Sequence, residues 1–169
     1  MKEVIEGITV EMSKTEDVET ILSLIMEAPD ALLAVSQPEI LGWIATGQSM
    51  VAKNLEGEIV GHQGMEYWEK ANLVEIRSAY VMPEYRGRGL NTAMKKQMIK
   101  RAKEKYPEAM IVGFTESASK SRGVLQRLGF EEIPFEEVPE DLFSVCPDTC
   151  VKKTGIDCGC KVYVLKKEE

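Results

Sequence analysis

The sequence predicts a mixed α/β (α+β) fold with a central sheet of about seven strands and about four helices. Its 169 residues fit one domain over 1–169, and its hydrophobic fraction of 44% and charged fraction of 29% are typical of a globular protein. Segments with strand-like apolar content occur before and after segments whose apolar residues recur at helical spacing. We therefore expect helices packed onto a sheet.

A strand, a basic glycine-rich turn and a helix form the most clearly organised part of the chain. Leu73–Val81 is rich in apolar residues and predicts a strand, whereas Leu90–Tyr106 carries apolar residues at helical spacing. Residues 86–89 between them read Arg-Gly-Arg-Gly. Glycine allows a ligand to approach closely, and the helix begins with unpaired N–H groups at the positive end of its dipole. The turn therefore predicts a site for a phosphate or pyrophosphate group. Its glycine spacing differs from that of the loops that bind dinucleotides or nucleoside triphosphates, so these two classes of ligand are not indicated.

The N-terminal part predicts one strand, over 8–12, and two capped helices. Ser13-x-x-Glu16 and Ser36-x-x-Glu39 both have the spacing of a capping box. Apolar residues at helical spacing follow each of them, so we expect a helix to start at each box.

Three successive strands are expected next, over 49–55, 58–67 and 73–81. Gly61 and Gly64 in the second of these strands predict a bulge or a close backbone approach. His62, the single histidine of the chain, lies between them. Packing or a surface polar role is favoured for it over the role of a catalytic base.

The C-terminal part predicts a buried parallel strand, a helix and a closing hairpin. In chain order these elements cover 110–115, 117–128, 131–138 and 161–165. The last two of these segments alternate well enough to pair as the hairpin.

The four cysteines, Cys146, Cys150, Cys158 and Cys160, all lie in an insertion at about 139–160 that joins the last two strands. Clustered thiols in an intracellular protein favour metal ligation or redox chemistry over disulfides. Four thiolates can hold a tetrahedral zinc ion, but the spacing Cys-x3-Cys-x7-Cys-x-Cys differs from a Cys-x2-Cys knuckle. A structural zinc site, reactive thiols and plain packing remain three alternatives.

The formal net charge of −7 argues against a nucleic-acid surface and mildly favours cationic partners. No segment reaches the ~20 apolar residues of a membrane span, and no signal peptide is visible. We therefore expect a cytoplasmic protein that binds neither nucleic acid nor membrane. Its oligomeric state stays open, with a homodimer as one option.

The basic turn and its lead-in resemble motif A of the GNAT (N-acetyltransferase) superfamily. Arg86 and Gly89 match the pattern Arg/Gln-x-x-Gly-x-Gly/Ala, and residues 81–85 match the lead-in Val-x-Pro-x-Tyr. Asn91 stands where the family usually has glycine or alanine. The resemblance implies a GNAT-like, splayed central sheet, and it covers the chain except the cysteine-rich insertion.

The same resemblance implies that acetyl-CoA is the co-substrate. Backbone N–H groups of the turn would hold its pyrophosphate, and free backbone at the end of the preceding strand would pair with its pantetheine. A main-chain N–H would polarise the thioester carbonyl. The implied cofactor-binding residues are Ala79, Tyr80, Val81, Arg86, Gly87, Arg88, Gly89, Leu90, Asn91, Thr92 and Ala118.

A second stretch resembles motif B of the superfamily, Tyr-x-x-x-Gly-Phe. Gly129 and Phe130 match it, whereas Leu125 replaces the tyrosine that usually serves as the general acid. Leucine cannot donate a proton. The candidates for this role are Tyr80, Ser121, Tyr163, a cysteine of the insertion and a water molecule.

Glu75 is the candidate general base. It lies eleven residues before Arg86, the offset at which the histone-acetyltransferase branch carries the glutamate that deprotonates the amine through water. An ordinary exposed strand carboxylate paired with Arg77 or a lysine is an equal alternative, because glutamate is usually solvated.

The sequence as a whole is interpreted as an acetyl-CoA-dependent N-acetyltransferase that transfers acetyl directly to a primary amine of a small molecule or protein. A non-catalytic acyl-CoA-binding module and a GNAT scaffold that carries a cysteine metal or redox site are the alternatives. The acceptor stays unidentified, because its pocket is expected from the two early helices and the last hairpin.

Overall fold

The computed structural model describes residues 2–27, 35–116, 121–134, 137–138 and 160–166. They build an eight-stranded sheet in the order β1-β2-β3-β4-β5-β6-β8-β7. The strands are β1 (Lys2–Ile5), β2 (Ile8–Met12), β3 (Ser49–Lys53), β4 (Ile59–Trp68), β5 (Leu73–Val81), β6 (Met110–Glu116), β7 (Phe130–Ile133) and β8 (Cys160–Leu165). The α-helices are α1 (Val18–Met26), α2 (Gln37–Ala45), α3 (Leu90–Lys105) and α4 (Ser121–Arg127). The expected mixed α+β class is confirmed.

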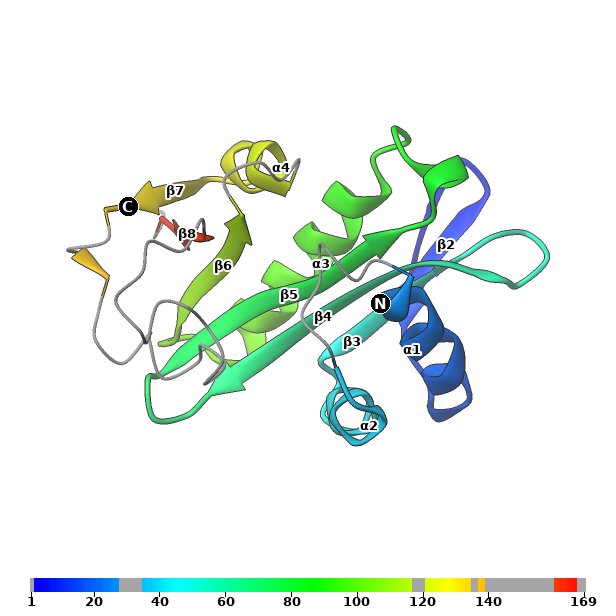
Figure 1. The fold of residues 1–169 in the computed structure, drawn as a ribbon, viewed down its shortest axis with the longest axis horizontal. Helices are drawn as coiled ribbons and strands as arrows, with labels where there is room; N and C mark the ends of the chain where they lie inside the picture. The colour runs from blue at the N-terminus through cyan, green and yellow to red at the C-terminus, as the bar shows by residue number, and fades with distance from the viewer. Residues whose placement is uncertain (1, 28–34, 117–120, 135–136, 139–159, 167–169) are drawn as a thin grey trace.

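The sheet opens in its middle, between β5 and β6. These two strands are parallel, as expected, and every other neighbouring pair is antiparallel. Their pairing runs only from Leu73–Met110 to Glu75–Val112. Beyond Glu75, β5 continues to Val81 beside β4, while β6 turns away toward α4 (Figure 1). The backbones of the two strands therefore diverge toward their C-terminal ends, and we call this divergence the wedge.

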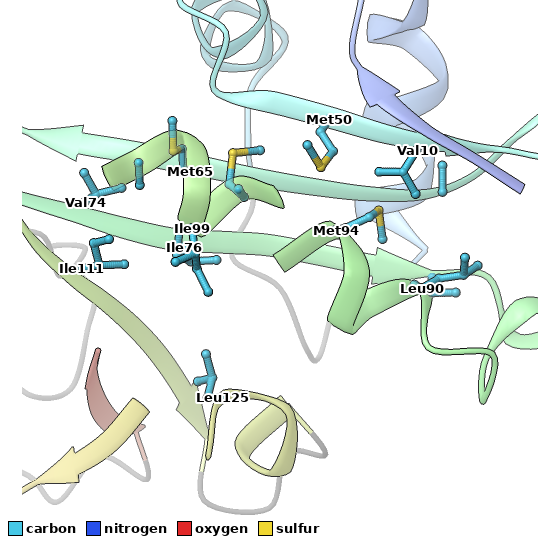
Figure 2. Packing of buried hydrophobic residues seen from close by; sticks show 14 of the residues in the cluster. Val10, Met50, Met65, Val74, Ile76, Leu90, Met94, Ile99, Ile111 and Leu125 are labelled. Carbon is cyan, nitrogen blue, oxygen red and sulfur yellow. The ribbon is translucent and has the colours of Figure 1, made fainter. Parts of the chain in front are cut away.

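Helices cover both faces of the sheet. Successive side chains of a strand point to opposite faces, so strands with apolar residues at successive positions have two faces to bury. On β3, Met50 belongs to the buried cluster under α3, whereas Val51 belongs to the cluster under α1 and α2. Figure 2 shows Met94 of α3 and Met65 of β4 among the side chains of the first cluster. Each fully buried aliphatic side chain contributes about 1.5–3 kcal/mol of hydrophobic stabilisation. The two packed layers hold β4 and β5 in place.

The described sheet has one strand more than the about seven expected, because β1 was not anticipated. β1 is four residues long and begins Lys2-Glu3, so it shows too little alternation to be recognised. It lies at the edge of the sheet and pairs with β2 from Lys2–Glu11 to Ile5–Ile8. Charged residues are tolerated on edge strands because one side of such a strand faces water.

The capping box expected from Ser13 and Glu16 does not form. The Ser13 hydroxyl forms a buried hydrogen bond of 2.8 Å with Ser49 Oγ, so it does not cap the helix. A 3-10 turn over Thr15–Asp17 precedes α1 instead, and the Lys14 N–H donates to Asp17 Oδ2 over 2.8 Å. The second box is confirmed, since Ser36 and Glu39 cap α2 reciprocally.

The closing hairpin is confirmed, although its first strand is shorter than expected. β7 ends at Ile133 rather than at Val138, and it pairs with β8 from Phe130–Leu165 to Ile133–Val162. Over the described residues, the helices lack the combined length and apolar character that crossing a membrane requires.

Candidate functional site

The start of α3 is built to leave backbone donors free. Gly89 is its N-cap, with φ at 80°, and it has no side chain that could cap the helix. The first intrahelical bond is donated by the Ala93 N–H to the Gly89 carbonyl, over 3.0 Å. The N–H groups of residues 90–92 therefore have no acceptor within the helix. No acidic side chain lies in this first turn, so the positive end of the helix dipole favours an anion.

The turn before α3 is open on its outer side. Gly87 and Gly89 both have φ near 80°, a conformation that side-chain-bearing residues rarely adopt. A Cβ added to either glycine would meet no heavy atom within 4 Å. A ligand can therefore approach this backbone closely.

The two arginines of the turn are held against the end of β5 and its 3-10 turn over Pro83–Tyr85. Arg86 Nε donates to the Val81 carbonyl over 2.8 Å, and its guanidinium lies 5.7 Å from the ring centroid of Tyr80. Arg88 Nη2 donates to the Glu84 carbonyl over 3.3 Å. Both side chains fix the shape of the turn and keep two positive charges beside its N–H groups.

The residues after the turn differ in what they offer a ligand. Leu90 is 2% exposed and packs in the core, so its N–H is its only polar group at the site. Asn91 keeps its N–H, and its Oδ1 is buried without a hydrogen-bond partner among the described residues. Ala118, the remaining residue of the expected cofactor set, lies outside the described residues.

A β-bulge interrupts β5 beside the wedge. Gly64 pairs with Arg77 and His62 pairs with Tyr80, so Gln63 of β4 alone faces two residues of β5, Ser78 and Ala79. Ser78 has φ at 53°, which for a serine within a strand stores strain of about 1–3 kcal/mol. The expectation from the two glycines of β4 is confirmed.

Both glycines are also sites of close approach. A Cβ on Gly61 would lie 3.1 Å from the Tyr80 carbonyl oxygen, and one on Gly64 would lie 3.3 Å from the ring of Trp43. An alanine at either position would require these neighbours to shift by a few tenths of an ångström.

Two side chains of β4 hold the carbonyl groups of the bulge. His62 Nδ1 donates to the Ser78 carbonyl over 2.9 Å, and Gln63 Nε2 donates to the Arg77 carbonyl over 2.7 Å. In a trans peptide the N–H points opposite to the C=O. The N–H groups of Ser78 and Ala79 therefore both point away from β4, toward the side on which β6 has left β5. Two adjacent donors on the side of β5 away from β4 can stabilise an oxyanion.

Glu75 lies at the apex of the wedge, as the last residue of β5 that pairs with β6. It is 8% exposed, so the alternative of an exposed carboxylate is wrong, whereas its expected pairing with Arg77 is confirmed at 3.7 Å. Trp68 Nε1 donates to Glu75 Oε2 over 3.3 Å. Burial raises the pKa of Glu75, and the charge of Arg77, which also pairs with Glu66, opposes this rise. A carboxylate of this kind accepts a proton more readily than a solvated one.

His62 has the structural role expected of it. It is fully buried, and burial lowers the pKa of its imidazole to about 4. Since the Ser78 carbonyl can only accept, Nδ1 carries the proton, and Nε2 accepts from the Ser49 hydroxyl over 3.1 Å. The ring of Trp43 stacks on it with centroids 6.4 Å apart.

Three of the candidates for the general acid, Tyr80, Tyr163 and Ser121, lie within the described residues, as does Leu125, which replaces the usual acid. Leu125, at the motif-B tyrosine position, is 2% exposed and packs in the core. The Tyr163 hydroxyl donates to Glu132 Oε2 over 2.9 Å, and the Tyr80 hydroxyl donates to Glu27 Oε2 over 3.4 Å. Burial and the neighbouring carboxylate raise the pKa of both phenols, which makes them weaker acids. Ser121 is placed only by its backbone in α4.

The expected metal ligands lie almost entirely outside the described residues. Cys146, Cys150 and Cys158 fall in 139–159, and Cys160 is described only as the first residue of β8. Within the described part of the chain, no group of three or more His, Cys, Asp or Glu side chains could hold a metal ion.

Sequence reasoning missed the residues that shape the bulge. Ser78 carries the left-handed backbone, and Gln63 fixes one of its two carbonyl groups. The pair of glycines flanking His62 and Gln63 was the signal for a bulge, but no pattern in β5 itself marked Ser78.

Comparison with known proteins places this geometry in a family. The model of the acetyltransferase (GNAT) family matches residues 16–130, which is more than half of the chain and includes Glu75, the bulge and the turn before α3. The chain belongs to the acetyltransferase (GNAT) family. Its class of reaction is acyl transfer from a CoA thioester. No curated protein sequence matches the chain significantly.

Solved structures share the fold at low sequence identity. The Mycobacterium tuberculosis protein Rv2747, solved with CoA and NLQ, is 22% identical with a TM-score of 0.73, over 94% of this chain and 99% of that one. Salmonella typhimurium YncA, a putative acetyltransferase solved with acetyl-CoA, is 18% identical with a TM-score of 0.68, over 94% and 92%. N-acetylglutamate synthase from Neisseria gonorrhoeae, solved with coenzyme A and N-acetyl-glutamate, is 17% identical with a TM-score of 0.73, over 98% of this chain and 36% of that one.

Proposed function

We propose that this chain is an acetyl-CoA-dependent N-acetyltransferase that transfers acetyl directly to a primary amine of a small molecule or protein. The proposal rests on two groups of backbone N–H donors that lie close together along the chain. The bulge at Ser78 and Ala79 lies beside the wedge, and the uncapped start of α3 follows the end of the same strand. A CoA thioester needs donors of this kind at its carbonyl and at its pyrophosphate.

The cofactor would bind along this segment. The N–H groups of residues 87–92 would hold the pyrophosphate, with Arg86 and Arg88 shaping the turn. The pantetheine would pair with the β5 backbone at residues 79–81, where β6 no longer occupies that side. The complexes of structurally similar proteins with CoA or acetyl-CoA support this choice of cofactor.

The chemistry would be direct attack by the amine on the thioester carbonyl. Glu75 would take a proton from the ammonium form of the acceptor, directly or through water, because its raised pKa makes it an effective base. As the C–N bond forms, the carbonyl oxygen becomes an oxyanion, which the N–H groups of Ser78 and Ala79 would stabilise. Collapse of this intermediate breaks the C–S bond and releases CoA as the thiolate, while the nitrogen loses its second proton to water and becomes the amide.

The leaving group reduces the need for a general acid. A thiol is a far stronger acid than an alcohol, with a pKa of about 8.5 for cysteine, so a thiolate can leave without a general acid and take its proton from water. This chemistry is compatible with leucine at position 125. The buried Leu125 equally favours the second candidate, a module that binds acyl-CoA without catalysis.

Acetyl-CoA turnover with a panel of primary amines separates the two candidates. Release of the CoA thiol would be followed with small-molecule amines and with peptide amino groups, and the acetylated product would be identified by mass spectrometry. Amine-dependent thiol release is expected of the transferase. Tight CoA binding with thiol release at the hydrolytic background for every amine would support the binding module instead.

A further inference from the structure

A buried lysine of α3 contacts the residue that shapes the bulge. Lys95 is 3% exposed, and its Nζ donates to Gln63 Oε1 over 3.0 Å. Gln63 is fully buried, and its Nε2 donates to the Gly64 carbonyl over 2.8 Å and to the Arg77 carbonyl over 2.7 Å. Because an ammonium group only donates, Lys95 fixes which end of the amide faces the bulge.

This lysine occupies a position where an apolar side chain would be less costly. Met94 and Met98 of the same helix are buried in the core under the sheet. Burial lowers the pKa of Lys95 to about 8, which shows that the protein interior disfavours its charged form. A methionine at position 95 would fill similar space without that penalty. The contact with Gln63 is therefore the feature of Lys95 that requires a role.

The bond between Lys95 and Gln63 connects α3 to the bulge at Ser78 and Ala79, where the thioester carbonyl would bind. The amide of Gln63 fixes the carbonyl of Arg77, and the N–H of Ser78 belongs to the same planar peptide. Rotation of that peptide would turn the N–H away from the wedge. His62 fixes the next peptide in the same way through the Ser78 carbonyl. The direction of both N–H groups thus depends on side chains of β4.

We propose that Gln63 and Lys95 are positioning residues for acyl transfer: Lys95 holds the Gln63 amide, which in turn aims the Ser78 N–H at the thioester carbonyl. This inference rests on the proposed function, because it requires acetyl-CoA in the wedge. Neither residue touches the reacting atoms. They act on the geometry of the oxyanion donors through the bonds from Lys95 to Gln63 and from Gln63 to the Arg77 carbonyl, whereas backbone N–H groups of residues 87–92 would hold the pyrophosphate.

Infrared spectroscopy of bound acetyl-CoA tests this inference without knowledge of the acceptor. Acetyl-CoA labelled with carbon-13 at the thioester carbonyl would be measured free and bound to the full chain. A hydrogen-bonded carbonyl absorbs at lower wavenumber, so we expect a downward shift on binding to the wild type. Gln63→Glu keeps an acceptor for Lys95 but removes the amide donor, and it should lose most of that shift. Lys95→Met should also reduce it, whereas the adjacent exposed lysine variant, Lys96→Met, should keep it.

Calorimetry with CoA, which lacks the acetyl group, provides the second readout. CoA affinity should stay within about threefold of wild type in Gln63→Glu and Lys95→Met, because the pyrophosphate site is untouched. Turnover with any amine found active should fall by about tenfold or more, since loss of one oxyanion donor costs about 10²–10³ in kcat.

The outcomes separate this inference from the proposed function. Wild type that fails to bind CoA would overturn both. Wild type that binds acetyl-CoA with a shifted carbonyl, together with an equal shift in Gln63→Glu and Lys95→Met, would overturn the positioning role alone. If a single variant does not fold, the double variant Gln63→Met/Lys95→Met replaces both partners by side chains of similar volume. It should fold and lose the shift, and retention of the full shift in it would likewise contradict the inference.

Discussion

The Nδ1 atom of His62 lies 2.9 Å from the carbonyl oxygen of Ser78, the residue with left-handed backbone in the middle of β5. This bond ties the imidazole to the bulge, and it requires a neutral ring in a fully buried site. Protonation would put a charge there without a carboxylate partner in the described structure around it. The state of this histidine and the stability of the fold are therefore linked.

Acid should destabilise the protein through His62. Its pKa is about 4 in the folded chain, against about 6.5 when unfolded, so the unfolded state binds more protons between these values. The stabilisation is fully present above pH 6.5 and is lost as pH falls toward 4, by up to about 3 kcal/mol. Because the chain has one histidine, its NMR titration can be followed without assignment. A midpoint near 6.5 would show that the ring is not buried as described.

Alkali should stabilise the protein through Lys95. Its pKa is about 8 when folded and about 10.5 when unfolded, so the unfolded state binds more protons between these values. The free energy of unfolding should rise across this window by up to about 3 kcal/mol in the wild type. Lys95→Met should abolish this rise and Lys96→Met should keep it, as measured by denaturant unfolding at several pH values. Equal pH dependence in both variants would contradict the burial of this ammonium.

Glu75→Gln should cut turnover by about 10²-fold or more at neutral pH. The loss should shrink at high pH, where the acceptor amine is already neutral. In the wild type, activity should fall as pH drops through the raised pKa of Glu75, and this acidic limb should vanish in the variant. Glu66→Gln is the matched control, because Glu66 contacts the same arginine from the neighbouring strand. A pH profile for Glu75→Gln that matches wild type would assign the base elsewhere.

A structural zinc site remains one of the three alternatives for the cysteines in the segment joining β7 and β8, and it can be tested directly. Elemental analysis of the purified protein should find about one zinc ion per chain, with the four thiols protected from titration until a chelator is added. Chelation should leave CoA affinity unchanged, because the turn before α3 belongs to a separate part of the chain. Four freely titrating thiols and no bound metal would leave reactive thiols or packing as the explanation.

Local patterns were sufficient to predict most of the elements that carry the site. The apolar run of β5 and the helical spacing of α3 extend over 9 and 16 residues, and both elements appear where they were expected. The box at Ser36 was recognisable because its two partners are three residues apart. Ser13 has the same local spacing, but its hydroxyl is held by Ser49, which is 36 residues away. A capping signal is lost when a tertiary contact takes the capping group.

The bulge depends on contacts that no local pattern contains. Lys95 looks like a surface residue of a helix with several lysines, and its burial arises because Gln63 of β4 lies opposite it. The burial of Glu75 likewise arises from Trp68 and Arg77 on neighbouring positions of the hairpin. These groups meet only once β4, β5 and α3 are packed together, so their chemistry follows from tertiary structure.

The central claim is that the turn before α3 holds the pyrophosphate of a CoA thioester. Titration of CoA into Gly89→Glu tests it most directly, with Gly57→Glu as the control. Both glycines have φ between 80° and 84° and open space around a Cβ, so the two substitutions impose similar strain. Gly57 lies in the turn between β3 and β4, outside residues 86–92.

A carboxylate about 4 Å from a phosphate charge costs about 4 kcal/mol at the dielectric of a protein surface. Gly89→Glu should therefore weaken CoA binding by on the order of 100-fold or more, while Gly57→Glu should bind CoA like the wild type. Equal CoA affinity for wild type and Gly89→Glu, measured by calorimetry on folded proteins, would contradict the assignment of the site.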